Sequence, residues 1–99
     1  MEIYTEIRQE YRQLTRDSLP PQEADQYIDG SITHAAGAYL SIATMSFYPF
    51  ALRELLQRDA KELWPWSEDT WNPSSTPRRN LIKAAAYIVA EIERLSRDA

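Results

Sequence analysis

The chain has 99 residues, of which 43% are apolar and 26% charged, which is typical of one small folded domain and excludes a disordered chain or a second core. It has no cysteine and one histidine, so a disulfide, a thiolate nucleophile and a zinc site of the usual nitrogen and sulfur type are excluded within one chain. Fifteen acidic against eleven basic residues give a net charge of −4, which disfavours binding to nucleic acids or anionic lipids.

The first predicted helix runs from about Glu2 to Thr15. Ile3, Ile7, Tyr11 and Leu14 recur there every three or four residues, which places them on one helix face. The opening sequence MEIYTEIRQE has neither the basic nor the apolar region of a signal peptide, so we expect a cytoplasmic protein.

Two prolines end this helix, because proline lacks an amide hydrogen and restricts the residue before it. Pro20 and Pro21 follow directly, and Pro21 suits the first turn of a second helix. Gly30 is expected to end that helix before a third element begins.

The stretch from Gly30 to Leu52 has no formal charge, which raises the question of a membrane span. Several hydroxyl side chains and Pro49 argue against one, and the apolar residues follow amphipathic helical spacing. We therefore predict a central helix from about Ser31 to Met45, packed between the others.

Two further helices are predicted beyond Pro49. Residues 50–63 place leucines on one side and charges on the other, and Trp64–Pro77 carries prolines and tryptophans typical of an ordered loop. The last helix starts at Pro77, with Thr76 as its N-cap, and runs to about Arg97. We expect it to bury one stripe of residues, namely Leu81, Ala85, Ile88, Ile92 and Leu95. Ile82, Ala86 and Val89 widen this stripe. The prediction is therefore an all-α, single-domain protein over residues 1–99, a compact bundle of about four helices.

Four carboxylates are candidates for binding Mg²⁺ or Mn²⁺. Glu6 and Glu10 lie four residues apart, as do Asp25 and Asp29, and like charges at that spacing repel unless something neutralises them. Magnesium sites for phosphate substrates use one or two carboxylates with phosphate oxygens. The alternative is a solvated acidic surface.

Three basic residues gather at the start of the last helix, where free amides favour anions. Arg78, Arg79 and Lys83 are thus candidates for binding phosphate. Alternatively, they pair with acids of the first helix or with Glu68 and Asp69.

Trp64, Trp66 and Trp71 fall within eight residues. They are candidates for stacking on a base or for anchoring a protein partner, and alternatively for closing the open end of the bundle. His34 is a candidate general base, or a hydrogen-bonded packing residue.

The C-terminal half resembles a group of small phage and prophage proteins. The resemblance lies in WPW at Trp64–Trp66, WNP at Trp71–Pro73 and RRNLIKAAAYIVAEIERLSR at Arg78–Arg97, and extends more weakly through 7–10 and 25–39. Those proteins are described as dATP/dGTP diphosphohydrolase-like and are grouped with the all-α nucleoside triphosphate pyrophosphohydrolases of the MazG type.

The resemblance implies Mg²⁺-dependent cleavage of a deoxynucleoside triphosphate to monophosphate and pyrophosphate. It implies that the four carboxylates bind the metal, that Arg78, Arg79 and Lys83 bind the phosphates, and that the tryptophans stack on the base. The sequence departs from the family pattern at three polar positions. It has Tyr27 where relatives tend to carry histidine, Ser31 where they tend to carry an acid, and Asn72 where they usually carry lysine. The alternative function is therefore a non-catalytic, phage-type interaction protein that binds and inhibits a host protein complex, for example one of a defence system.

We also expect a homodimer or larger assembly, because a bundle this small has more apolar helix surface than one core covers. The expected partners are thus a second copy of the chain and, in addition, either a nucleotide or a host protein complex. Neither a membrane nor a nucleic acid is expected.

Overall fold

A computed structural model describes residues 2–98 of the chain, and within that range it contains helices and no strand. The all-α prediction is confirmed. The elements in chain order are α1 (Ile3–Asp17), α2 (Pro21–Ala24), α3 (Ser31–Met45), α4 (Phe50–Leu63), a short 3₁₀ helix η1 (Glu68–Thr70) and α5 (Pro77–Asp98).

Side-chain and backbone caps set several of these boundaries. The Glu2 carboxylate accepts hydrogen bonds from the first amides of α1. Thr76 caps α5 as predicted, because its hydroxyl accepts from the Arg79 amide at 3.4 Å. Gly30 precedes α3 with φ of 90°, a left-handed conformation that a residue with a Cβ rarely adopts. The predicted second helix is only one turn long.

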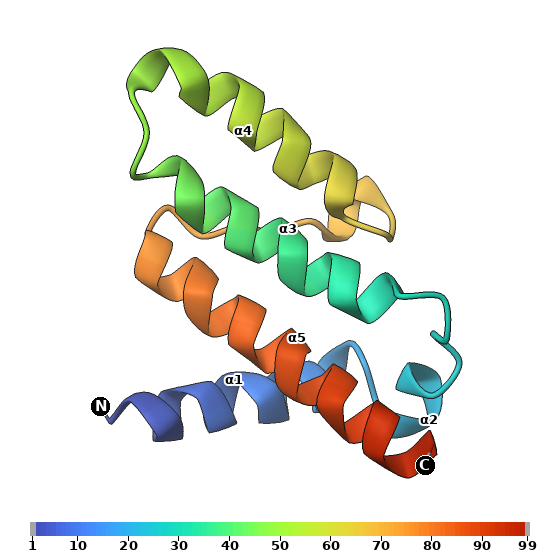
Figure 1. The fold of residues 1–99 in the computed structure, drawn as a ribbon. Helices are drawn as coiled ribbons and strands as arrows, with labels where there is room; N and C mark the ends of the chain where they lie inside the picture. Colours follow the sequence, from blue (N-terminus) through green and yellow to red (C-terminus); the bar gives the residue numbers. More distant parts are fainter. Residues whose placement is uncertain (1, 99) are drawn as a thin grey trace.

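Helix α3 lies in the middle of the molecule, with α4 on one side and α5 on the other (Figure 1). Helix α1 packs across α5, and the short α2 also contacts α5. The central position explains why the uncharged segment is α3, since both of its long sides are covered by protein. None of the described helices is long and apolar enough to cross a membrane.

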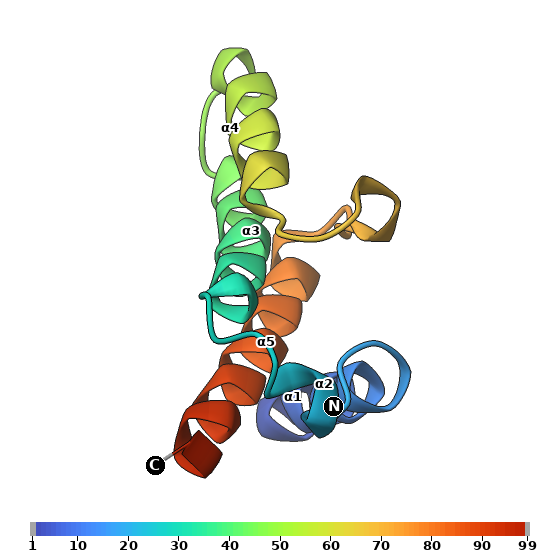
Figure 2. The same cartoon turned by 90° about the vertical axis from the view of Figure 1, so that its right-hand side faces the viewer.

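The helices α4, α3 and α5 form a single layer. Seen along its edge, this layer carries α1, α2 and the loop at residues 64–76 on one side only (Figure 2). No described helix covers the opposite side. The molecule measures 43 × 33 × 24 Å along its principal axes, in keeping with this flat arrangement.

The interior of the layer is built mainly from alanine. Nine of the sixteen buried apolar side chains of the described chain are alanines, including Ala35 and Ala38 of α3, Ala60 of α4 and Ala84 of α5. Small side chains let neighbouring helices approach closely. Apart from Ile32, Ile42 and Ile82, which are buried, most large aliphatic residues of the layer are exposed.

The expected buried stripe of the last helix is wrong at its four large residues, whereas Ile82 and Ala86, which were expected to widen it, are buried. Leu81, Ile88, Ile92 and Leu95 are between 43% and 57% exposed, and the buried positions of α5 include Ala84, Ala86 and Ala90. Helix α5 meets α3 and α1 mainly through these small residues, so its leucines and isoleucines, except Ile82, are left exposed. Helical spacing places the stripe residues on one face of the helix, but it could not say that the neighbouring helices cover another face.

Candidate functional site

Two adjoining hollows lie between the C-terminal part of α1, the loop at residues 64–76 and α5. They enclose about 430 and about 210 Å³, and the larger falls within the roughly 300–1,000 Å³ of typical ligand pockets. Both hollows are lined by Asp17, Ser18, Thr70 and Tyr87. Because they share these walls, they form one site, which we call the loop cleft.

The smaller hollow contains a lysine beside a carboxylate. Lys83 and Glu10 both line it, and the Lys83 ammonium donates to the Asn72 carbonyl oxygen at 2.8 Å. The same ammonium lies 5.5 Å from the centre of the Tyr39 ring, a cation–π distance. Burial lowers the pKa of Lys83 from its ordinary value. This hollow therefore offers the Lys83 ammonium to a ligand, beside a Glu10 carboxylate that is paired with Arg79.

The larger hollow has aromatic walls and an acidic rim. Tyr27, Trp66 and Tyr87 line it with Asp17 and Glu23, and no basic residue does so. The ring centres of Tyr27 and Trp66 are 5.3 Å apart, and those of Trp66 and Tyr87 are 6.1 Å apart. The indole nitrogen of Trp66 is buried and has no hydrogen-bond partner among residues 2–98. A flat aromatic ring or a cation fits such walls better than an aliphatic chain does.

Hydrogen bonds fix the loop that forms one side of the cleft. The Trp64 indole donates to the Thr70 hydroxyl at 3.0 Å. The buried Asn80 side chain accepts from the Ser74 amide at 2.7 Å and donates to the Ser74 carbonyl at 2.9 Å. The loop is thus ordered, as predicted, although it includes one 3₁₀ turn.

The three tryptophans have different positions. Trp64 is buried in the core beside Ala60 and Tyr39, and Trp71 packs on the Tyr39 ring with centres 4.7 Å apart. Both contacts agree with the interpretation that these rings close the bundle end. Trp66 lines the larger hollow, as does an edge of Trp64. Of the three, Trp66 is the ring best placed for a ligand.

The two arginines proposed for phosphate pair with acids of the first helix. Arg78 donates to both Glu6 oxygens, at 2.9 and 2.7 Å, and Arg79 donates to Glu10. These hydrogen bonds hold the pKa of Glu6 below its ordinary value. This is the ion pairing that the sequence left open as an alternative. Lys83 alone of the basic trio lines the loop cleft.

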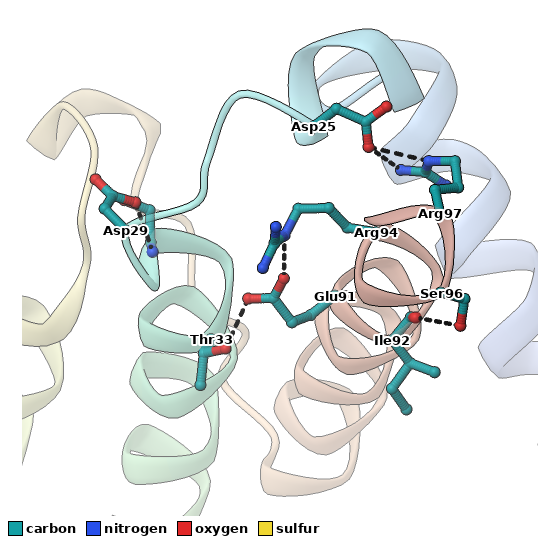
Figure 3. Close-up of polar contacts among 9 residues, drawn as sticks. Asp25, Asp29, Thr33, Glu91, Ile92, Arg94, Ser96 and Arg97 are labelled. Carbon is teal, nitrogen blue, oxygen red and sulfur yellow. Dashed lines mark hydrogen bonds and ion pairs between the residues drawn. The ribbon is translucent and has the colours of Figure 1, made fainter. Parts of the chain in front are cut away.

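The four predicted metal carboxylates do not come together. Arg97 donates to Asp25 at 3.0 and 2.8 Å, while Asp29 accepts from the Ser31 amide at 3.0 Å and its hydroxyl at 2.7 Å (Figure 3). Hydrogen bonds from Ser31 hold the pKa of Asp29 below its ordinary value. Within residues 2–98, no three acidic or histidine side chains form a metal-binding group. Glu10 alone of the four lines the loop cleft.

Sequence reasoning missed several cleft residues. Asp17 lies seven residues after Glu10, which places both on one side of α1, and this spacing was a usable signal. Tyr39 and Tyr87 are central to the site, and burial raises the pKa of both from the ordinary tyrosine value. Their contact depends on how α3 meets α5, and no local pattern encodes that. His34 lies exposed on α3 and does not line the cleft.

No protein-family model, no curated protein and no solved structure matches the chain. The resemblance to phage nucleotide pyrophosphohydrolases therefore stays a prediction, and the functional argument depends on the loop cleft itself.

Proposed function

We propose that this chain binds a nucleoside triphosphate, together with Mg²⁺ or Mn²⁺, in the loop cleft. The observation that supports the proposal is convergence. The sequence indicates Glu10, Lys83 and Trp66 separately, as candidates for metal, phosphate and base, and they line two hollows that share four residues. They belong to α1, α5 and the loop, so their proximity is a property of the fold and not of local sequence.

Each hollow suits one part of a nucleotide. The larger hollow offers the rings of Trp66 and Tyr87 to a base, since base–aromatic stacking contributes roughly 1–3 kcal/mol. The smaller hollow offers the Lys83 ammonium to phosphate oxygens.

A magnesium ion on a triphosphate needs one or two carboxylates, and Glu10 and Asp17 line this hollow. In the unbound chain they accept hydrogen bonds from Arg79 and Arg16, so binding the ion would replace these two arginines. Because these acids repel phosphate, we expect binding to require the divalent cation.

The reaction implied by the resemblance is release of pyrophosphate from the bound triphosphate. The metal would supply charge neutralisation and an activated water. Of the four carboxylates predicted to bind a metal, Glu10 is the one that lines the same hollow as Lys83, so it is the first residue to test.

A titration of intrinsic tryptophan fluorescence with the four dNTPs and four NTPs tests this proposal, with pyrophosphate release assayed on the same samples. We expect a saturable change that requires Mg²⁺ or Mn²⁺. Lys83→Gln should weaken binding by about tenfold or more, the effect of losing one charged hydrogen bond. Arg58→Gln, at an exposed position of α4 that lines neither hollow, is the control and should leave binding within about twofold. No saturable change with any nucleotide at millimolar concentration would overturn the proposal.

A second candidate function is supported by the acidic rim of the larger hollow. Asp17 and Glu23 beside Tyr27, Trp66 and Tyr87 suit the arginine or lysine side chain of a protein partner. The net charge of −4 and the pairing of Glu6, Glu10 and Asp25 with arginines also suit an interaction protein without catalysis. The resemblance to phage proteins supports a host protein complex as that partner, which the chain would inhibit by occupying it.

The two candidates differ in the charge of the ligand. N-acetyl-arginine amide should quench tryptophan fluorescence saturably if the second candidate is correct, and N-acetyl-glutamine amide should not. The Asp17→Asn/Glu23→Gln double variant should then lose the response, because both carboxylates of the rim are neutralised. A response to Mg²⁺–dNTP and none to the arginine amide would reject this second candidate.

A further inference from the structure

The side of α5 that no other helix covers carries a continuous apolar stripe. We call the set Leu81, Ala85, Ile88, Ile92 and Leu95 the α5 stripe. Its members follow one another at spacings of four, three, four and three residues, which is the spacing of a helix–helix seam. Its four large side chains are each about half exposed. A helix in contact with solvent alone does not need this pattern.

The neighbouring helix extends this surface. Thr33 of α3 donates to Glu91 of α5 at 2.7 Å, so that side of α3 faces α5. Leu40 lies two turns along the same side and is also about half exposed. No member of the α5 stripe is charged, and neither is any residue of α3. The uncovered face is therefore apolar across two adjacent helices.

The total surface of the chain is large for its mass. A folded monomer of 11.5 kDa is expected to expose about 5,800 Å². The chain exposes 6545 Å², which is about 700 Å² more than this expectation. In a standard protein–protein interface each partner buries about 800 Å². The excess is thus close to what one stable dimer contact would cover.

We propose that the α5 stripe and Leu40 bind the same face of a second copy of this chain. A domain normally has at least two layers packed around its core, and the layer of α4, α3 and α5 lacks one on this side. A second copy supplies that layer by a two-fold axis, which requires a self-complementary face. The small Ala85 between Leu81 and Ile88 leaves room for a large side chain of the partner helix.

Charge favours a second copy over other occupants. Each chain carries a net charge of −4, so two copies repel unless they meet through a face without acids, and the α5 stripe is such a face. Binding to a lipid surface would need lysine or arginine around the stripe facing the membrane, and the uncharged α3 provides none beside it. Figure 2 shows α1 and the loop at residues 64–76 on one side of the layer only, and the loop cleft lies between them and α5, so a copy bound on the uncovered side leaves each cleft open.

Sedimentation equilibrium at about 100 µM chain tests the proposal, because a high concentration favours association and the method measures the mass of the species in solution. We expect a mass twice the 11.5 kDa of one chain. The Ile88→Glu/Ile92→Glu variant should have the mass of one chain, since each dimer would bury four unpaired carboxylates. Ile92→Leu should remain a dimer, as should Tyr4→Glu, which places one added carboxylate on the exposed part of α1.

Circular dichroism of the double variant verifies that it still folds, and unchanged helicity is expected because both isoleucines are about half exposed already. A wild-type mass of 11.5 kDa at this concentration would overturn the proposal. So would a dimer that survives the double variant, since another face would then hold the two copies together.

Discussion

At the scale of single residues, the most consequential polar contact is a buried ion pair within α5 that is also hydrogen-bonded to α3. Glu91 and Arg94 are both buried, with 2.5 Å between the Arg94 Nε and a Glu91 oxygen. The other Glu91 oxygen accepts from Thr33, which ties the pair to α3 (Figure 3). The carboxylate therefore depends on two partners that come from different helices. This pair could not be predicted from the sequence. Residues 53–99 contain eight acids and eight bases, and no local pattern shows that Glu91 and Arg94 are the buried ones.

Removing one partner of this pair should cost more than removing both. Arg94→Met leaves Glu91 buried and without its counter-charge, and such a loss typically costs about 3–5 kcal/mol. The Arg94→Met/Glu91→Leu double variant should recover most of that free energy of unfolding, since no charge then stays buried. Urea unfolding of the wild type and both variants measures this. A double variant less stable than Arg94→Met would contradict the contact.

Tyr11 gives a pH dependence at the alkaline end. Burial, a hydrogen bond to Glu93 and that carboxylate's charge raise the pKa of Tyr11 to about 12, against about 10 in the unfolded chain. Its contribution is fully present below pH of about 10 and is lost as pH rises through about 12, because the unfolded chain releases the proton first.

We therefore expect stability to fall between pH of about 10 and about 12, and to fall less in Tyr11→Phe. At pH 7 that variant should lose only the hydrogen bond, about 0.5–1.5 kcal/mol. Urea midpoints at several pH values provide the measurement. Equal alkaline slopes in the two proteins would show that Tyr11 is not held neutral by the fold.

At the scale of elements, the sequence predicts helices well and their buried faces less well. Prolines, the Thr76 cap and apolar spacing were enough to place α3, α4 and α5 to within a residue or so. The buried face of α5 could not be read in the same way, because alanine and leucine both count as apolar. Ala84 is buried and Leu81 is exposed, because the closely packed helices leave room at their contact for a small side chain but not for most large ones.

The alanine contacts between helices predict sensitivity to added volume. Ala84→Leu should destabilise the fold by about 1–3 kcal/mol, because its Cβ already lies within the core formed by α3, α4 and α5. Ala51→Leu, at an exposed position of α4, is the matched control and should change stability by no more than about 0.5 kcal/mol. Thermal unfolding of both variants measures the difference. Equal effects would show that α3 and α5 are not in close contact.

The loop cleft was only partly predictable from the sequence. Glu10, Lys83 and Trp66 were identified as residue types suited to metal, phosphate and base, yet their proximity depends on how α1 and the loop lie on α5. The pairing of Arg78 with Glu6 was also undetermined, because an acid and a base 72 residues apart in the chain show no relation until the helices are packed.

At the scale of the whole molecule, the chain is a helical layer with two different sides. One side carries α1, α2 and the loop at residues 64–76 (Figure 2), and α1 and the loop form the loop cleft with α5. The half-exposed α5 stripe belongs to the side that no described helix covers. A ligand and a second copy can therefore bind at the same time. The arrangement allows two loop clefts per dimer, each facing outward.

A dimer makes thermal stability depend on protein concentration. The midpoint of unfolding should rise with concentration for the wild type, because dimerisation stabilises the folded chain by mass action. It should be independent of concentration in the Ile88→Glu/Ile92→Glu variant. Differential scanning calorimetry over a hundredfold range of concentration is the measurement, and a wild-type midpoint that does not move would contradict the dimer.

The loop cleft as a nucleotide site is the central claim, and the three tryptophan indole signals in a ¹H–¹⁵N correlation spectrum test it most directly. Mg²⁺–dNTP should shift the Trp66 indole signal most, since that N–H is unpartnered beside the larger hollow, while the Trp64 indole already donates to Thr70. The backbone amides near Lys83 should shift with it. If all three indole signals stay in place at saturating Mg²⁺–dNTP, or if only signals of the α5 stripe move, the loop cleft does not bind nucleotide.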